Sequence, residues 1–417
     1  MTDQIIPEGD FREHGVSRLS ILVILAAAAA AVASPAAAWP TCGRVDRLPG
    51  KEWRSVDPSR HGWDGAQLAA ARAVFDNQPS AAVMIVHRGR LIAEWGTTAE
   101  RYTAQSVRKA LVSSLVGQLI AAGKLDLDAT LEEMGIDDID PPLTNEERQA
   151  TLRDLLRSRS GIFHSALYEV GGWKRERMAL ADEERAAGYD LYPHGAYWIY
   201  NNWDFNAVGT IIENAAGEEI GPLFAKNIAA PIRMQDFRAA DVEYTTKDHP
   251  AEQRFGNVSE HRAYVINIST RDLARYGLLY LNCGKWGRRQ IVPKKWVLES
   301  IVGPDTRIGR PADRQLTGFG DYGYLWQIDR PGSRRYPGVG TREPFFIAEG
   351  ARGHSMAVFP SLDLVIAHQV ATVGGVGVEA QMKRAKDGSP EVTDGQLSAL
   401  YAAIIKAHPR TATAFEE

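Results

Sequence analysis

The sequence predicts an α/β fold of the α+β type, with one antiparallel sheet flanked by helices and a mostly helical region inserted into it. Two observations lead to this prediction. Short apolar strand patterns occur near both ends of the chain, and amphipathic helical patterns occupy the part between them. A sheet assembled from both ends accounts for this order, because each strand pattern then finds partners and an apolar face to bury.

Composition narrows the class of protein. The 417 residues are 44% hydrophobic and 24% charged, which is typical of a globular chain with one or two domains. The net charge of -4 gives no basic surface for nucleic acid. The histidines show no metal-binding spacing and no nucleotide-binding glycine loop is present, so we expect no metal and no cofactor. The two cysteines, Cys42 and Cys283, form either one bridge or two buried thiols.

Residues 1–38 have the pattern of an export leader. The apolar run at residues 19–33 is short for a membrane span, and small residues follow it up to Ala38. We expect a signal peptide cleaved after Ala38 or an uncleaved membrane anchor, and therefore a periplasmic or secreted protein. Membrane contact follows only if the leader is uncleaved. Residues 39–64 are rich in turn-forming residues and are expected to be an irregular lead-in.

Each element of the first half follows from its own pattern. A short helix is expected at Ala66–Phe75, and two strands at 82–87 and 91–95 flank a tight turn. The next helix begins at Ser106, and a shorter helix covers Thr151–Leu156.

Residues 163–198 are aromatic, charged and irregular, which is typical of a functional loop rather than a connector. Helices are expected after this loop, and the C-terminal part alternates strands with turns before a closing helix. The expected helices are 208–216, 269–281, 292–300 and 396–407, and the expected strands are 323–328, 345–348, 356–359 and 364–368.

Ser106 and Lys109 are the first candidates for chemistry. They lie one helical turn apart on the same face, so the amine reaches the hydroxyl. Serine is a weak nucleophile until a base takes its proton, and a lysine among apolar residues has a lowered pKa that suits this role. The start of the helix also offers free backbone amides to an oxyanion. Taken alone, the pair is more typical of a capping serine and a solvated lysine than of a catalytic pair.

Across about residues 65–408 the order of segments resembles the serine β-lactamase-like family. That family includes class C β-lactamases, D-alanyl-D-alanine carboxypeptidases, certain esterases and 6-aminohexanoate-dimer hydrolases. The resemblance implies a β-lactamase/transpeptidase-like fold and a serine hydrolase domain at 65–410. The matching stretches are SVRKALVSSLVGQLIAAGKLDLD, TLRDLLRSRSGI, YNNWDFNAVGTIIE, STRDLARYGLLYLNCGKW and MAVFPSLDLVIAH.

The resemblance assigns roles to two motifs. Ser106 would be the nucleophile, and Lys109 its proton acceptor or electrostatic partner. Tyr200, which begins a Tyr-x-Asn motif, would as a phenolate take the serine proton and later activate water, so the general base is either Lys109 or Tyr200. Asn202 would orient Lys109 or hold a substrate amide. Without the resemblance, Tyr200 would be interpreted as a core aromatic residue.

A second Tyr-x-Asn sequence, at Tyr280 and Asn282, falls in the last turn of a helix and is interpreted as structural. The third family motif, Lys-Thr-Gly or His-Thr-Gly, has its counterpart at 350–354, where the lysine is missing. A backbone amide near Arg352 or Gly353 would complete an oxyanion hole with the Ser106 amide. Arg352 either replaces the missing cation or points to solvent, and His354 either lines the pocket or packs in the core.

These features predict an exported serine hydrolase that acts through an acyl-enzyme on a small ester or amide, similar to the esterase and 6-aminohexanoate-dimer hydrolase branch. The alternative is hydrolysis of β-lactams or of D,D-peptides in peptidoglycan. A non-catalytic ligand-binding protein on the same fold is a hypothesis from another class. The presence of Ser106, Lys109 and Tyr200 favours an enzyme over that hypothesis.

Overall fold

The computed structural model describes residues 42–169, 193–196, 198–303, 321–330, 335–339, 344–371, 377 and 390–412. The predicted leader at 1–38 lies outside the described residues, as does the middle of the predicted functional loop at 163–198.

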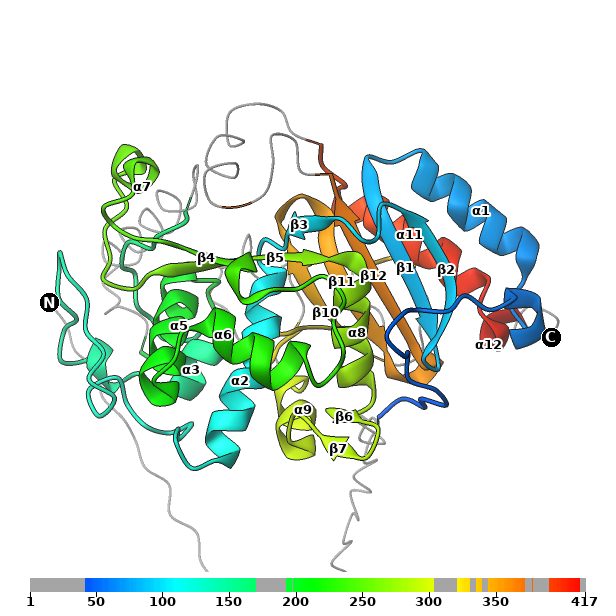
Figure 1. Cartoon of the computed structure of the whole chain (residues 1–417). Helices are drawn as coiled ribbons and strands as arrows, with labels where there is room; N and C mark the ends of the chain where they lie inside the picture. Colours follow the sequence, from blue (N-terminus) through cyan, green and yellow to red (C-terminus); the bar gives the residue numbers. More distant parts are fainter. Residues whose placement is uncertain are drawn as a thin grey trace, which may run out of the picture. The chain divides into compact units, whose positions relative to one another are not determined.

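A seven-stranded antiparallel sheet is built from both ends of the chain, as predicted (Figure 1). N-terminal β1 pairs with C-terminal β12, with Val83 opposite His368. The strand order is β2-β1-β12-β11-β10-β9-β8. The bounds are β1 Ser80–His87, β2 Arg90–Gly96, β8 Asp321–Tyr322, β9 Gln327–Asp329, β10 Phe345–Gly350, β11 His354–Phe359 and β12 Leu364–Val370.

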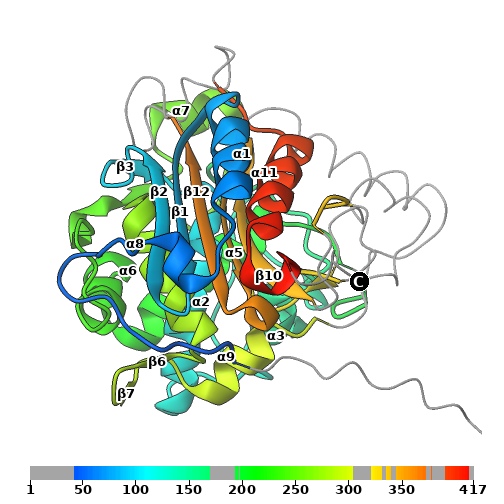
Figure 2. The ribbon, with the colours of Figure 1, turned by 90° about the vertical axis from the view of Figure 1, so that its right-hand side faces the viewer.

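The sheet separates two hydrophobic cores, because successive side chains of a strand point to opposite faces. In β1, Val83 and Ile85 belong to one core, and Met84 and Val86 belong to the other. Helices α1 (Gly65–Asp76) and α11 (Asp394–Lys406) cover the first face, as the two ribbon views show (Figures 1 and 2). Helix α8 (Thr270–Leu281) packs on the second face, where Gly277 leaves room for Val365 and Met356.

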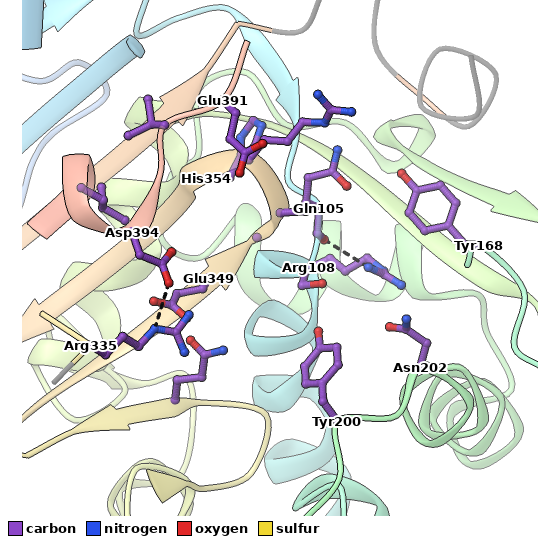
Figure 3. A pocket seen from close by; sticks show the side chains of 18 of the residues that line it. Gln105, Arg108, Tyr168, Tyr200, Asn202, Arg335, Glu349, His354, Glu391 and Asp394 are labelled. Atoms are coloured by element: carbon purple, nitrogen blue, oxygen red, sulfur yellow. Dashed lines mark hydrogen bonds and ion pairs between the residues drawn. The ribbon is translucent and has the colours of Figure 1, made fainter. Parts of the chain in front are cut away.

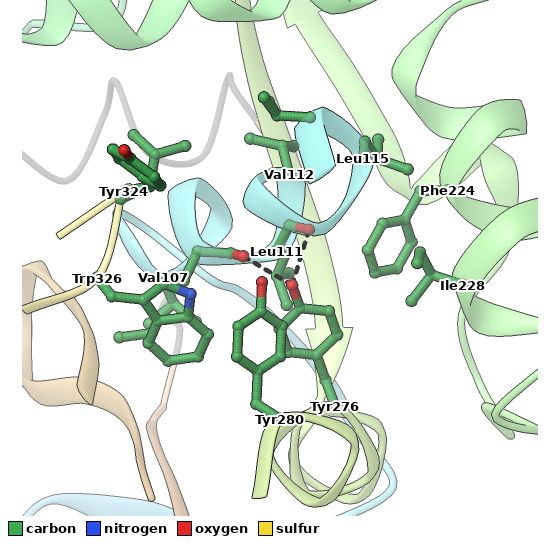
Figure 4. Close-up of a cluster of buried hydrophobic side chains, with 14 of the residues drawn as sticks. Val107, Leu111, Val112, Leu115, Phe224, Ile228, Tyr276, Tyr280, Tyr324 and Trp326 are labelled. Atoms are coloured by element: carbon green, nitrogen blue, oxygen red, sulfur yellow. Dashed lines mark hydrogen bonds between the residues drawn. The ribbon is translucent and has the colours of Figure 1, made fainter. Parts of the chain in front are cut away.

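Helix α2 (Val107–Ala121) is buried almost all round, and its first turn carries the candidate catalytic residues. Tyr276 on α8 donates from its hydroxyl to the carbonyls of Ala110 and Leu111, at 2.7 and 3.0 Å (Figure 4). On another side the Trp296 ring lies against Gly117, where any side chain would collide with it. These contacts fix α2 between the sheet-bound α8 and the inserted region.

The inserted region contains short helices and a second, three-stranded sheet of order β3-β5-β4, which the sequence analysis missed. A small hairpin of β6 and β7 precedes α9. The strands are β3 Arg101–Thr103, β4 Val242–Thr245, β5 Ala263–Ser269, β6 Lys285–Trp286 and β7 Arg289–Gln290. The remaining helices are α3 Leu152–Leu156, α5 Asn202–Ala216, α6 Ile220–Phe224, α7 Pro250–Phe255, α9 Lys294–Ser300 and α12 Pro409–Ala412.

Two predicted elements differ from the structure. Of the strand predicted at 323–328, only residues 327–328 are extended, as the start of β9, while residues 323–326 form a turn between β8 and β9. In this turn Leu325 has a φ of 67° and the Gly323 amide donates to the Trp326 carbonyl. This turn is buried, so it consists of apolar and aromatic residues like those of a buried strand. Helix α5 begins at Asn202 instead of Val208, because the Asn201 side chain caps it by accepting from the Trp203 amide.

A disulfide joins Cys42 to Cys283, with the Cα atoms 5.5 Å apart. It settles the two alternatives for the cysteines and holds the lead-in against the end of α8, where the Gly43 amide also donates to the Leu281 carbonyl. Among the described residues, none of the helices has both the length and the apolar character needed to cross a membrane.

Candidate active site

A cavity of about 470 Å³ opens at the N-terminus of α2. Its walls come from segments far apart in the sequence: the start of α2, the segment before α5, the β10–β11 hairpin and the start of α11 (Figure 3). Ser106, Tyr200 and Asn202 line it together with Arg352, Gly353 and His354, so the structure brings these six sequence-predicted residues to one place.

Ser106 stands at the N-cap position of α2, yet its hydroxyl makes no capping hydrogen bond. The preceding residue, Gln105, has a left-handed φ of 52°, an unfavourable conformation for a residue with a side chain. This sharp turn leads from β3 into α2. Ser106 is therefore half-buried at the cavity, with its hydroxyl available for another partner.

That partner is Lys109. Its Nζ lies 2.9 Å from Ser106 Oγ and 2.8 Å from Asn202 Oδ1, and it also contacts the Tyr200 hydroxyl. The Tyr200 and Phe205 rings flank the amine, with their centroids 4.5 and 4.6 Å away. The alternative of a solvated lysine is excluded, because Lys109 is only 2% exposed.

Burial lowers the pKa of Lys109 well below its usual value, and the charge of Arg108 lowers it further. Glu169 acts in the opposite direction. The charged form of the amine is thus disfavoured, which is the condition for a lysine to accept a proton near neutral pH.

Tyr200 differs from the prediction of a resting phenolate. Burial raises its pKa to about 12, although a hydrogen bond with Ser106 and the charge of Arg108 act against this rise. Its hydroxyl therefore keeps its proton near neutral pH. Tyr200 can pass protons between Lys109 and a leaving group, while Lys109 is the better proton acceptor at rest.

Glu169 fixes the orientation of the Asn202 amide. Asn202 Nδ2 donates to Glu169 Oε1 at 3.2 Å, so the amide oxygen must face Lys109. A neutral amine has two N–H groups and one lone pair, and a carbonyl oxygen can only accept. With Asn202 taking one N–H of Lys109, at least one of the two hydroxyls, of Ser106 or Tyr200, must donate to the lone pair.

The hairpin that follows β10 supplies the third wall. Arg352 has a φ of 70° within the turn, and its carbonyl accepts from the Val392 amide at 3.1 Å. Gly353 faces Val392, and His354 is 3% exposed and starts β11. The residue that packs against the Ser106 turn is instead Gly350, where a Cβ atom would lie 2.7 Å from the Ala104 carbonyl oxygen.

Sequence reasoning missed several lining residues. Arg108 lies next to Ser106 in the first turn of α2, and Glu169 lies next to Asn202. Neither residue belongs to a recognised motif. Arg335 and Glu349 form a buried ion pair on the opposite wall. Burial raises the pKa of Glu349 to about 8, while Arg335 opposes this. Glu349 directly precedes Gly350, so the strand beside Ser106 carries an acidic residue and no lysine.

The second Tyr-x-Asn sequence lies in the core, as interpreted from its helical context. Tyr280 is 1% exposed and packs on Trp326, with ring centroids 4.6 Å apart. Asn282 donates to the Lys285 carbonyl. Neither residue lines the cavity. Within the described residues, no group of three or more His, Cys, Asp or Glu side chains could hold a metal ion.

Comparison with known proteins places this geometry in a family. Esterase EstB from Burkholderia gladioli is 26% identical over 215 residues, which cover 44% of this chain and 54% of the esterase. This chain thus spans about half the length of that curated relative. A proposed 6-aminohexanoate-dimer hydrolase from Bacillus anthracis superimposes with a TM-score of 0.57 at 17% identity, covering 90% of each chain.

A class C β-lactamase solved with cefoxitin superimposes with a TM-score of 0.53 at 13% identity, covering 84% of this chain and 99% of the other. At such identities both structures show the fold alone. The profile of the family described as Beta-lactamase matches residues 68–387, which is most of the chain. The chain therefore belongs to the β-lactamase family of serine hydrolases.

Proposed function

We propose that this protein hydrolyses a small ester or amide through an acyl-enzyme on Ser106. The observation that carries the proposal is the environment of Lys109, a buried amine with a lowered pKa that contacts Ser106, Tyr200 and Asn202. A structural lysine would gain nothing from this desolvation, whereas a proton acceptor requires it.

The first half-reaction forms the acyl-enzyme. Ser106 Oγ attacks the substrate carbonyl carbon while its proton passes to Lys109 Nζ. The resulting oxyanion is stabilised by the Ser106 amide and by a backbone amide at the end of β10, because Gly350 lets that strand approach the Ser106 turn. When the tetrahedral intermediate collapses, the leaving group departs with the proton, which Tyr200 relays from Lys109.

The second half-reaction releases the acid. Water attacks the acyl carbon and gives a proton to the Lys109–Tyr200 pair, and the same proton returns to Ser106 Oγ as the ester bond breaks. No cofactor takes part in either half-reaction as proposed. The relatedness to an esterase supports an ester or amide substrate.

The alternative substrates, β-lactams and D,D-peptides, carry a carboxylate beside the scissile bond. The β10 wall places Glu349 there, with its only ionic contact among the described residues directed to Arg335. Because β10 carries no lysine to bind such a carboxylate, we place ester or amide hydrolysis first.

The test is the intact mass of the protein after mixing with p-nitrophenyl butyrate and, separately, with benzylpenicillin, followed over time. Rapid ester turnover without a penicilloyl adduct supports the proposal, and Ser106→Ala must abolish it. A persistent penicilloyl adduct that is absent from Ser106→Ala would favour the penicillin-interactive alternative. Activity that survives in Ser106→Ala, or the absence of both reactions, would overturn the mechanism and favour the binding-protein hypothesis.

We also propose that the protein is exported to an oxidising compartment. The leader pattern at 1–38 and the Cys42–Cys283 bridge support this, since disulfides persist outside the reducing cytosol. Fractionation of cells followed by N-terminal sequencing of the protein tests it. A new N-terminus after Ala38 indicates cleavage, an intact leader in membranes indicates an anchor, and an intact cytosolic protein contradicts export.

A further inference from the structure

Arg108 is a buried cation on the cavity wall. Its side chain belongs to the first turn of α2, between Ser106 and Lys109 along the chain, and the residue is 2% exposed. Nη1 donates to the Gln105 carbonyl at 3.2 Å, and among the described residues Nε has no hydrogen-bond partner. None of the described carboxylates forms an ion pair with it.

Two tyrosine rings hold the guanidinium in place. The Arg108 Cζ atom lies 5.3 Å from the ring centroids of both Tyr168 and Tyr264. Cation–π contacts keep such a group charged and ordered without neutralising it. A buried charge is costly unless it is paired, so a preorganised guanidinium that faces a cavity is suited to an anionic ligand.

The opposite wall differs in charge. There Arg335 contacts Glu349 and lies 3.9 Å from Asp394, so its charge is already matched (Figure 3). Figure 3 shows Arg108 on the other side of the cavity, extending between Tyr168 and Asn202. The nearby Glu169 carboxylate accepts from Asn202. An anion entering the cavity therefore meets, on the side opposite the Arg335–Glu349 pair, a guanidinium with which none of the described carboxylates forms an ion pair.

We propose that Arg108 binds a carboxylate of the substrate, so that the preferred ester or amide carries an anionic group. The inference rests on the proposed function, because the scissile carbonyl must sit at Ser106. The planar guanidinium can make two parallel hydrogen bonds to a carboxylate, which fixes the substrate in one orientation. Arg108 is then a determinant of specificity in addition to lowering the pKa of Lys109.

The test compares matched neutral and anionic esters. Mono-p-nitrophenyl glutarate places a carboxylate in the acyl part, and p-nitrophenyl butyrate is its neutral counterpart. 4-(Butyryloxy)benzoate places the carboxylate in the leaving group, with phenyl butyrate as its counterpart. We expect kcat/KM of at least one anionic ester to exceed that of its counterpart by about tenfold or more.

In Arg108→Met this ratio should fall to about one. Removing Arg108 also changes the Lys109 environment, but that effect acts on both esters of a pair and cancels in the ratio. Arg108→Lys keeps the charge without the planar geometry, so its ratio should be intermediate, and it serves if the methionine variant does not fold. Arg72→Met, which removes an exposed guanidinium paired with Asp76 on α1, should leave the ratio unchanged.

A wild-type ratio at or below one for both pairs, or an unchanged ratio in both Arg108 variants, would overturn the inference. Turnover of the neutral esters with no anionic preference refutes this inference alone. Failure of every ester to acylate Ser106 refutes the proposed function as well, so the two failures can be told apart.

Discussion

Two segments of this chain carry the same Tyr-x-Asn spacing, but one lies at the cavity and the other packs in the core. Tyr200 and Asn202 lie at the cavity and both contact Lys109. Tyr280 lies in the aromatic core, and Asn282 follows the end of α8 and donates to the Lys285 carbonyl at the start of β6. The spacing alone therefore does not specify the function.

Backbone conformation explains the difference. Asn201 is extended, with φ −135° and ψ 112°, so its two neighbours Tyr200 and Asn202 project to the same side. Tyr280 belongs to a helix, where residues two apart do not face each other. Both residues of the motif contact Lys109 only at Tyr200 and Asn202, where an extended segment leads into the start of α5.

Replacing Lys109, the shared partner of Tyr200 and Asn202, should have the largest effect on activity. We expect Lys109→Met to lose ester hydrolysis by about a thousandfold or more, since the serine loses its base. The same variant should be more stable than the parent at neutral pH, because the unfolded lysine binds a proton that the folded one releases.

The sign of this linkage gives a sharper test. The folded pKa of Lys109 is lowered, so the parent gains stability as the pH rises toward the unfolded value, and its deficit relative to Lys109→Met should close near pH 10.5. Urea unfolding of both proteins across this range measures it. A pH-independent difference would mean that Lys109 is charged in the folded protein.

Removing the two tyrosine hydroxyls compares the segments directly. Tyr200→Phe should lower kcat by about a hundredfold or more, because proton transfer to the leaving group is lost. Tyr280→Phe should leave kcat within about twofold and change stability by less than about 1 kcal/mol. Steady-state kinetics measures kcat of both variants, and thermal unfolding measures their stability. Equal losses of kcat would contradict the separation of roles.

The sequence predicted what depends on local patterns and on their order along the chain. The two-ended sheet, α2 and the cluster of Ser106, Lys109, Tyr200 and Asn202 follow from period, spacing and resemblance.

What the sequence could not predict depends on contacts between distant segments. The Arg335–Glu349 ion pair joins residues whose proximity only the folded sheet creates. The partner of Asn202, Glu169, sits in a stretch without a periodic pattern. The buried turn at 323–326 has the apolar composition of a strand, and only its backbone angles distinguish it.

Glu169→Gln, which alters the partner of Asn202, should have an intermediate effect on kcat. A glutamine can present either end to Asn202, so the orientation of the amide is no longer fixed, and we expect kcat to fall by about tenfold. Since Glu169 raises the pKa of Lys109, the acidic limb of the rate–pH profile should move to lower pH. Glu146→Gln, which alters an exposed carboxylate outside the cavity lining, is the control.

Either a fall in kcat without movement of the acidic limb, or the same change in Glu146→Gln, would contradict the positioning role of Glu169. Recovery of the parental limb in Glu169→Asp would strengthen it, because the shorter carboxylate keeps the charge near Lys109 and can present only acceptor oxygens to Asn202.

The smallest effect on activity should come from the end of α8, next to Asn282. The Cys42–Cys283 bridge closes a loop of 241 residues, so Cys42→Ser with Cys283→Ser should lower the free energy of unfolding by about 2–4 kcal/mol. Folded protein should keep kcat within about twofold, because none of the groups at Cys283 lines the cavity. Urea unfolding and ester kinetics, both well below the unfolding temperature, measure the two effects. A large loss of kcat in the folded double variant would mean that the α8 end positions α2 through Tyr276, and the two Tyr-x-Asn segments would then be coupled rather than independent.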